Sequence, residues 1–323
     1  IYYADILPNN AFSGPKIFSS NLKTSFHEGP ATFDAAANRI YFNGNRSSKN
    51  ASSKSNENNL QIYYADRENG DWVFKGGFKY NDPSYNLRHP SIDAKGEIMF
   101  FASDMPGGKG GNDIYWCRKE NGEWSEPVNL EYVNSEGDEV FPWIAPDGVL
   151  YFSSNGHGGM GGLDVWMAIP DRGVYTKIEN MGYPLNTTRD DFGIVLDEVG
   201  MNGFFSSNRP GGLGHDDIYQ VQILWIPVQI RGTVRDRLNT YEIAGATVSL
   251  LDESGSVIET AVTKEDGEFQ FKAYKQRNYK LKVEKPEFIG ATKDVSTFNK
   301  LPNAIIDVEL FIEMDFSSLE APD

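Results

Sequence analysis

Apolar and polar residues alternate along most of this chain, in short stretches that are separated by turn-forming residues. Alternation with a period of two predicts β-strands that bury one face, and it argues against helical repeats. One strand pattern, an isoleucine or valine followed by an aromatic residue, recurs at intervals of 61, 52, 51 and 53 residues. Its copies occupy residues 1–5, 62–66, 114–118, 165–169 and 218–222. The chain is therefore predicted to be an all-β repeat protein.

Each complete repeat also contains a hairpin before the recurring strand and a short strand after it. The hairpins span residues 30–42, 90–101, 142–152 and 193–205. Four short strands in roughly 50 residues are typical of a β-propeller blade, because one small antiparallel sheet cannot bury its faces without neighbours. We predict a propeller of five or six four-stranded blades over residues 1–225, in which residues 1–25 form only half a blade. The polar stretch 49–58 is predicted to be a surface excursion.

A glycine-rich loop precedes the recurring strand three times, at residues 103–115, 154–166 and 206–219. A phosphate-binding loop is normally present once, opens a helix and in its P-loop form ends in Gly-Lys-Ser/Thr, whereas these loops repeat and run into strands. Each contains an aspartate that we expect to accept hydrogen bonds from the backbone N–H groups of its own loop. These structural residues are Asp113, Asp164 and Asp217. The alternative is a calcium site, with Asp104, Asn155 and Asn208 as further oxygen ligands.

The pattern changes after residue 225. Glycine loops stop, and alternating strands separated by tight turns predict a small β-sandwich over residues 226–312, followed by a linker or tail at 313–323. This part resembles the carboxypeptidase regulatory-like, transthyretin-like domain. The resemblance rests on Gly232, Val234, Asp236, Gly245-Ala246, Val248, Thr263, Asp266-Gly267, Phe269, Phe271 and Tyr279.

Charged side chains recur just before the first strand of successive blades, a register that usually lines the central opening of a propeller. They are Glu28, Arg88, His89, Glu139, Asp190 and Asp191. We expect a polar rim there, and three interpretations remain open. The rim is solvated, it contacts a ligand or partner, or its paired carboxylates serve as the acid and base of a glycosidase. Reversing Glu139, Asp190 and Asp191 to lysine is expected to leave folding intact and to weaken capture of a partner.

Composition excludes several classes of function. A net charge of −16 argues against a nucleic-acid surface, and no apolar run approaches the length of a membrane helix. The single Cys117 excludes an internal disulfide and a multi-cysteine zinc site; we expect it to be buried. The four histidines fall in different zones of the blades, no G-x-S-x-G motif is present, and we predict no metal and no cofactor. A secretion signal or lipid anchor would lie upstream of residue 1.

The repeat region resembles the TolB-like, WD-repeat-like propellers. Together with the sandwich, the phrases RHPSIDAKGEIMFFASDMPGGKGGNDIY and GDEVFPWIAPDGVLYFSSNGHGGMGGLDVW are similar to periplasmic OmpA-family proteins of Bacteroidetes, including the PorE-like component of the type IX secretion and gliding apparatus. The resemblance implies a periplasmic protein at the outer membrane, with envelope or secretion-system proteins as partners. It also implies binding to peptidoglycan through an OmpA-like domain, which no residue of this sequence resembles.

These patterns predict a non-catalytic scaffold or protein-interaction module. Exposed Trp72, Trp124 and Trp143 could dock a partner, but we expect them to pack between blades. Two other functions remain open, a periplasmic enzyme acting on glycans through the acidic rim and a sensor that binds a glycan or peptide. A deep pocket with converging carboxylates would favour the enzyme.

Overall fold

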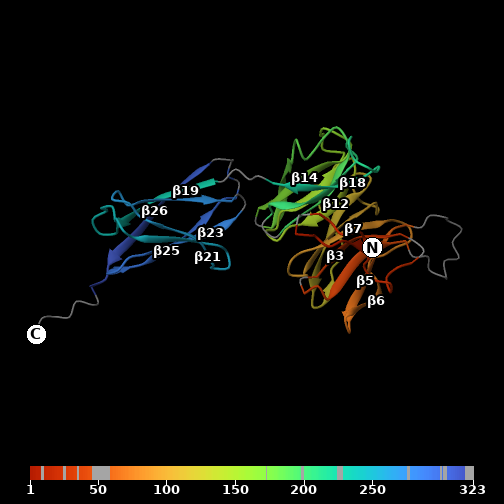
Figure 1. The fold of residues 1–323 in the computed structure, drawn as a ribbon, viewed down its shortest axis with the longest axis horizontal. Coiled ribbons are helices and arrows are strands. Elements are labelled where there is room, and N and C mark those ends of the chain that lie inside the picture. Colours follow the sequence, from red (N-terminus) through yellow and green to blue (C-terminus); the bar gives the residue numbers. More distant parts are fainter. Residues whose placement is uncertain are drawn as a thin grey trace, which may run out of the picture. The chain divides into compact units, whose positions relative to one another are not determined.

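The structure is a computed structural model that describes residues 1–8, 11–24, 27–34, 36–45, 59–171, 173–197, 200–223, 228–274, 277–298, 300 and 304–316. The expected excursion at 49–58 lies outside the described residues. Every named element is a β-strand (Figure 1), so the prediction of an all-β chain is confirmed. The chain divides into two compact units, Ile1–Ile223 and Leu224–Asp323.

The first unit is a series of antiparallel sheets whose strands follow one another in sequence order, as in propeller blades. The first full sheet contains β3 (Glu28–Phe33), β4 (Arg39–Gly44), β5 (Gln61–Glu68) and β6 (Asp71–Gly77). The second contains β7 (Leu87–Ile92), β8 (Ile98–Ser103) and β9 (Asp113–Glu120), with β10 (Glu123–Trp124) and β11 (Val128–Asn129) both paired to β9. The third contains β12 (Glu139–Ile144), β13 (Leu150–Ser154), β14 (Asp164–Asp171) and β15 (Val174–Asn180).

Two sheets have fewer than four strands, which was expected for residues 1–25 but not for the last blade. The last one contains β16 (Asp191–Leu196), β17 (Asn202–Ser207) and β18 (Asp217–Gln222), and the N-terminal one contains only β1 (Tyr2–Tyr3) and β2 (Lys16–Ile17). The described residues of the first unit thus form five sheets, of which the two at the ends of the series have fewer than four strands. The two-stranded N-terminal sheet follows from the repeat pattern, because no hairpin stands before the recurring strand of residues 1–5.

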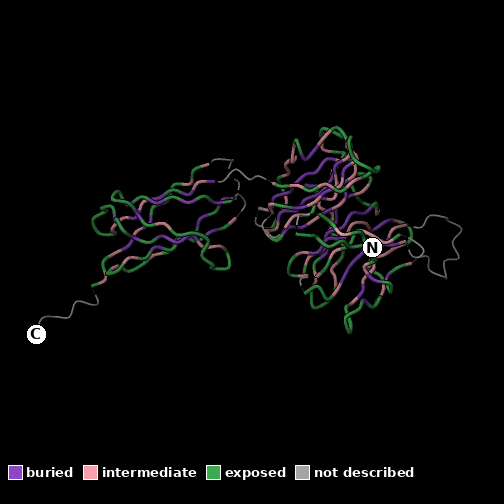
Figure 2. The backbone as a smooth tube through the Cα atoms, in the orientation of Figure 1, coloured by how far each residue is buried: buried purple, intermediate pink, exposed green. Residues whose placement is uncertain are grey.

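The core lies between successive sheets. One cluster joins Tyr41 and Ile62 of the first full sheet to Met99 and Phe101 of the second, and another joins Phe100 of the second to residues of the third. Figure 2 shows the buried segments along the middle of the strands and the exposed ones at their turns. Stacking of this kind is what a repeated four-stranded sheet requires, because neither of its faces is stable in water.

Each innermost strand contains a β-bulge. The pairing register shifts between Gly29 and Ala31 in β3, and it shifts at the equivalent place in β7, β12 and β16. Three of the bulged residues, His89, Phe141 and Gly193, have φ angles of 52°, 52° and 66°, which lie in the left-handed region. A bulge bends the strand and redirects its side chains. The bulges therefore bring His89 and Phe141 to the same zone of neighbouring sheets.

The second unit is a β-sandwich. One sheet has the order β22-β19-β26-β24 and the other has the order β21-β20-β23-β25. The bounds are β19 (Val228–Asp236), β20 (Thr247–Leu251), β21 (Val257–Val262), β22 (Glu268–Ala273), β23 (Asn278–Glu284), β24 (Phe288–Ile289), β25 (Ala291–Ser296) and β26 (Ile305–Met314). Alternate residues such as Ile230, Val248 and Leu281 are fully buried between the sheets. The prediction of a propeller followed by a sandwich is confirmed.

Candidate functional site

The innermost strands of four sheets surround one pocket of about 270 Å³. Its walls come from β3, β7, β12 and β16, and they are formed mainly by proline, aromatic and aliphatic residues. They include Pro30, Phe33, Pro90, Phe141, Pro142, Trp143 and Ile194. We call this pocket the central opening. The prolines restrict the backbone φ angle at this surface, and the bulges set the direction of the neighbouring side chains.

His89 is the one titratable residue among those that line the central opening. Its ring stacks on that of Phe141 with centroids 3.7 Å apart, and its Nδ1 accepts a hydrogen bond from the backbone N–H of Phe141 at 3.1 Å. Burial, with a smaller contribution from the charge of Arg88, lowers the pKa of His89 to about 3. His89 is therefore neutral near pH 7, and its Nδ1 lone pair is already used.

Glu139 does not lie on an exposed rim, because its side chain is fully buried. Its Oε2 accepts a hydrogen bond from the backbone N–H of Ser135 at 2.7 Å, and its Oε1 accepts from the hydroxyls of Ser135 at 2.5 Å and Ser154 at 2.6 Å. The Nε2 atom of His157 lies 3.6 Å from the carboxylate. Both oxygens are therefore occupied by the protein itself.

Asp191 occupies the same place one sheet later, and it is also fully buried. It accepts hydrogen bonds from the backbone N–H of Thr187 at 2.6 Å, from the hydroxyl of Ser207 at 2.6 Å and from Nη2 of Arg209 at 2.6 Å. Glu28, which is half-buried, accepts from the backbone N–H of Thr24 at 2.7 Å. Each acid is thus held by a serine or threonine four residues before it.

These placements correct the expected rim. Glu139 and Asp191 are buried supports behind the innermost strands, and lysine at either position would leave buried donors facing a buried cation. The burial of these two side chains argues against the expectation that their reversal to lysine leaves folding intact, and we now expect the reversal to destabilise the propeller. The structure brings His89 to the central opening, and it places Glu28, Glu139 and Asp191 at equivalent positions of three different sheets rather than in one cluster.

Asp190 joins neighbouring sheets. Its Oδ1 accepts a hydrogen bond at 2.9 Å from the backbone N–H of Leu163, in the glycine loop of the preceding sheet, and its Oδ2 accepts from the side-chain amide of Asn208 at 2.8 Å. Asp138 makes the same kind of bridge, because its carboxylate accepts from the backbone N–H of Asn112 at 2.8 Å and from the side-chain amide of Asn155 at 3.4 Å. Burial alone would raise the pKa of Asp138, but these hydrogen bonds and the charge of Arg88 hold it below its usual value. Both half-buried acids serve the joint between sheets.

Arg88 is half-buried, and its Nε atom is buried without a hydrogen-bond partner among the described residues. Its sheet neighbour on the next strand is Ala102, and the equivalent residue of the third sheet is the buried Val140. The charge of Arg88 lowers the pKa of both Asp138 and His89.

The three loop aspartates accept hydrogen bonds from their own glycine loops. Asp113 accepts from the backbone N–H of Lys109 at 2.5 Å, Asp164 from that of Met160 at 2.6 Å, and Asp217 from that of Gly214 at 3.0 Å. A glycine faces each carboxylate because a Cβ atom would overlap it: Gly108, Gly159 and Gly212. The glycines of the loop are thereby explained without a bound phosphate.

The oxygen atoms considered as calcium ligands have protein partners instead. Asp104 accepts hydrogen bonds from the backbone and the side chain of Asn86 at 2.6 and 2.7 Å. Asn155 and Asn208 accept from the backbone N–H groups of Asp138 and Asp190. Within the described ranges, no group of three or more His, Cys, Asp or Glu residues is placed to hold a metal ion.

Sequence reasoning missed a repeated asparagine clamp. The side chains of Asn81, Asn134 and Asn186 each bond both the N–H and the C=O of one residue at the start of the third strand, at distances of 2.7–3.1 Å. The clamped residues are Ile62, Ile114 and Val165. The intervals of 53 and 52 residues between the asparagines match the repeat, and this was the available signal.

The remaining candidates have packing roles. Cys117 is fully buried, and burial raises the pKa of its thiol to about 12, so it is not a reactive thiolate. Trp124 contacts the rings of Tyr41 and Phe78 in the preceding sheet. Trp72 contacts Phe18. Trp143, in contrast, lines the central opening.

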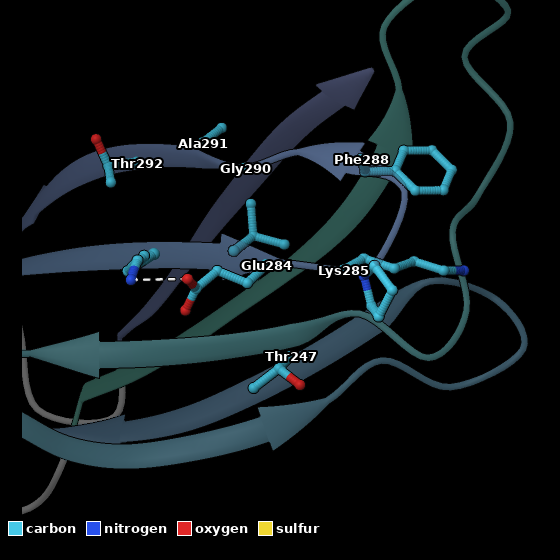
Figure 3. A pocket seen from close by; sticks show the side chains of 10 residues that line it. Thr247, Glu284, Lys285, Phe288, Gly290, Ala291 and Thr292 are labelled. Atoms are coloured by element: carbon cyan, nitrogen blue, oxygen red, sulfur yellow. Dashed lines mark ion pairs between the residues drawn. The ribbon is translucent and has the colours of Figure 1, made fainter. Parts of the chain in front are cut away.

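The sandwich carries a separate shallow groove of about 720 Å³ (Figure 3). Lys285 extends along one end of it, where its ammonium group donates to the carbonyl of Ala244 at 2.6 Å and lies 5.4 Å from the ring centre of Phe288. Lys282 and Glu284 form an ion pair of 2.8 Å beside it. Both partners are about half exposed, so the pair contributes little to stability.

Comparison with known proteins supports the second domain directly. Residues 229–310 match the family model of the carboxypeptidase regulatory-like domain. No curated protein matches the chain in sequence. Within the described residues, no helix is long and apolar enough to cross a membrane.

Several solved structures are similar to the chain at low identity. TolB from Acinetobacter baumannii is 16% identical with a TM-score of 0.42, and the match covers 80% of this chain but only 57% of that one. A putative TolB from Agrobacterium tumefaciens is 14% identical with a TM-score of 0.42, covering 82% and 80%. A puromycin-hydrolyzing peptidase of Mycobacterium tuberculosis is 14% identical with a TM-score of 0.39, covering 68% and 33%. The assignment of the first unit as a propeller rests on the strand order of its own sheets.

Proposed function

We propose that the protein is a non-catalytic interaction module of the periplasm, in which the propeller binds a protein partner. One observation carries this proposal. The carboxylates that could have served as acid and base, Glu139 and Asp191, are fully buried and accept hydrogen bonds from their own chain. A general acid or base must reach the substrate directly or through one water molecule, and these two groups cannot.

The central opening is the surface best suited to a partner. Its proline and aromatic walls offer apolar area that needs little ordering on binding, and buried aromatic residues supply most of the energy in protein interfaces. Trp143 is half-buried there, and its ring centre lies 5.6 Å from that of Tyr151. The ring is thus held in place but still reachable, which favours an apolar or proline-containing segment of a partner.

The envelope setting comes from the resemblance to periplasmic OmpA-family proteins. We propose that the module belongs to the outer-membrane type IX secretion or gliding machinery and connects it to peptidoglycan through an OmpA-like domain outside this sequence. In this arrangement the carboxypeptidase regulatory-like sandwich is a spacer. Its compact core of alternating buried residues supports a passive role of this kind.

A sensor that binds a glycan or peptide is the second candidate, and the aromatic walls of the same opening favour it over an enzyme. Sugars and proline-rich peptides both stack on exposed tryptophan rings, and such binding needs no titratable group. The half-buried His89 and Trp143 would then contact the ligand directly.

The test compares two aromatic substitutions. Trp143→Ala removes a wall of the central opening, whereas Tyr132→Ala removes a 66% exposed ring that is not among its lining residues. We expect Trp143→Ala to lose the envelope proteins that the parent captures after cross-linking, and Tyr132→Ala to retain them. Equal capture by both variants would place the binding surface elsewhere. Release of products from purified peptidoglycan by the parent would support an enzyme instead.

A further inference from the structure

The last sheet of the propeller exposes the face that the other sheets bury. Ile62, Ile114 and Val165, at the start of the third strand in successive sheets, have no exposed surface. The equivalent Ile218 is 77% exposed. Gln220 and Gln222 on the same face of β18 are exposed as well. Among the described residues, no strand covers this face as the next sheet covers the same face of each preceding sheet.

The glycine loop before β18 lacks the same neighbour. The backbone of Gly110 lies against the carbonyl of Gly137, and that of Gly161 lies against the carbonyl of Arg189, so closely that a Cβ atom would overlap them. At the equivalent Gly214 the nearest atom to a Cβ would be 3.5 Å away, and it belongs to the same loop. Position 214 is therefore a glycine although no described residue lies close enough to exclude a Cβ atom there.

One backbone N–H group of this loop also has no acceptor among the described residues. In each earlier joint, the residue two positions before the buried aliphatic residue donates its backbone N–H to a side-chain oxygen of the following turn. The pairs are Leu60 with Asn86, Asn112 with Asp138, and Leu163 with Asp190, at 2.8–2.9 Å. The equivalent residue is Asp216, whose N–H has no partner in the described part of the chain.

The strands β1 and β2 already occupy the outer half of the missing neighbour. Phe12 contacts the ring of Phe204 in the last sheet at 5.5 Å, as Trp124 contacts the ring of Tyr41 at 6.2 Å in a complete joint. The backbone N–H of Phe18 donates to the carbonyl of Ile1, as that of Phe78 donates to Ile62. The strand β1 is therefore the third strand of a blade.

The inner half of this blade is open. Among the described residues β1 pairs only with β2, whereas β5, β9 and β14 each have a strand on both edges. Tyr2 is 65% exposed, although Tyr115 and Trp166 at the equivalent position are buried. A largely apolar cavity of about 340 Å³ lies between the N-terminal segment and the last sheet, and it is lined by Ile6, Phe12, Val195 and Phe204 among others.

We infer that the face of β18 and the free edge of β1 bind one occupant, a two-stranded β-hairpin of the kind that begins the other blades. Its second strand pairs with β1, and its apolar face covers Ile218 and Phe204. The turn before its first strand accepts the N–H of Asp216. This binding surface repeats a joint that the molecule already contains three times, and it adjoins the central opening at Val195, which lines both cavities.

The loop also specifies the residue that accepts this hydrogen bond. Asp138 and Asp190 lie against Gly111 and Gly162, where a Cβ atom would overlap their carboxylates. The third loop has His215 at this position. In the first joint the residue there is Asn59, and the acceptor is the side chain of Asn86. The occupant therefore carries an asparagine or another acceptor placed like Asn86, rather than like the two aspartates.

A chimera tests this inference. Residues 83–113, which contain Asn86 and the hairpin β7–β8, are placed a second time directly before Ile1, because Ile114 follows them in the natural repeat. The covalent link supplies a high effective concentration. We expect the amide hydrogen of Asp216 to exchange at least about tenfold more slowly in the chimera than in the parent, and the propeller to melt at a higher temperature.

The matched control is Ile218→Asp, made in both the parent and the chimera. In the parent this exposed residue can change without loss of stability, so the melting temperature should stay the same. In the chimera the charge should restore fast exchange at Asp216, because it would be buried by the hairpin. Unchanged exchange at Asp216 in the chimera would overturn the inference. So would a dimeric parent that Ile218→Asp converts to a monomer, because a second copy would then be the occupant.

Discussion

Glu139→Ala tests most sharply whether the acids at the start of the innermost strands are structural. The substitution removes a fully buried carboxylate that accepts three hydrogen bonds of 2.5–2.7 Å. Glu136→Ala is the matched control, since it removes the same side chain from an exposed position three residues earlier. If the acids form a binding rim, both variants should be as stable as the parent. If Glu139 is a structural support, only Glu136→Ala should be.

The magnitude follows from the three donors. Hydrogen bonds to a charged group contribute about 1.5–3 kcal/mol each, but the hydroxyls of Ser135 and Ser154 can rotate toward other acceptors. The backbone N–H of Ser135 cannot, and the desolvation of the carboxylate is relieved in the variant. The net loss is therefore expected to be about 2–4 kcal/mol, with Glu136→Ala within about 0.5 kcal/mol of the parent.

Tryptophan fluorescence during urea and thermal unfolding reports this loss. Five of the six tryptophans lie in the propeller and the sixth is Trp225, so the sandwich contributes little to the signal. For a unit of this size the loss corresponds to a fall in melting temperature of roughly 5–15 °C. Equal stability of Glu139→Ala and Glu136→Ala would refute the reasoning.

Three further predictions concern other parts of the chain. Asp164→Ala should destabilise the propeller by about 1–3 kcal/mol, because the N–H groups of Met160 and Gly161 lose their acceptor; a calcium-dependent melting temperature in the parent would instead favour a bound ion. The stability of the propeller should fall as the pH falls below 6.5, because the pKa of His89 is about 3 in the folded chain and 6.5 in the unfolded one. The unfolded chain therefore takes up the proton first. His89→Gln should flatten the plot of stability against pH between pH 7 and 5, and an unaltered plot would exclude His89 as the cause. Residues 227–312 should fold alone, because the core of the sandwich is formed within them; an isolated segment with poorly dispersed amide signals would contradict the boundary.

The repeat made much of the fold predictable. Period-2 alternation and the recurring Ile-Tyr or Val-Trp pair place the strands, and the glycine loops place the turns between them. The loop aspartates could be interpreted from sequence because the same spacing occurs three times. The half blade of residues 1–25 was predictable in the same way, but the three-stranded last sheet was not, because pairing depends on which segments meet in space rather than on local pattern.

The candidate site was harder to predict, for a physical reason. The repeat register fixes where Glu139 and Asp191 lie along a strand, but it does not fix how deeply their side chains are buried. The informative signal was the serine or threonine four residues earlier, at Thr24, Ser135 and Thr187, which bonds each carboxylate. The proline and aromatic walls of the central opening depend on β-bulges, and no local sequence pattern predicts those bulges.

The central claim is that the repeated polar residues join one sheet to the next, and amide exchange tests it most directly. In the parent protein, the N–H groups of Asn112 and Leu163 are bonded to Asp138 and Asp190 at 2.8 and 2.9 Å, whereas the N–H of the equivalent Asp216 has no such partner among the described residues. We predict that the first two exchange at least about tenfold more slowly than the third. Equally fast exchange at all three would contradict the account.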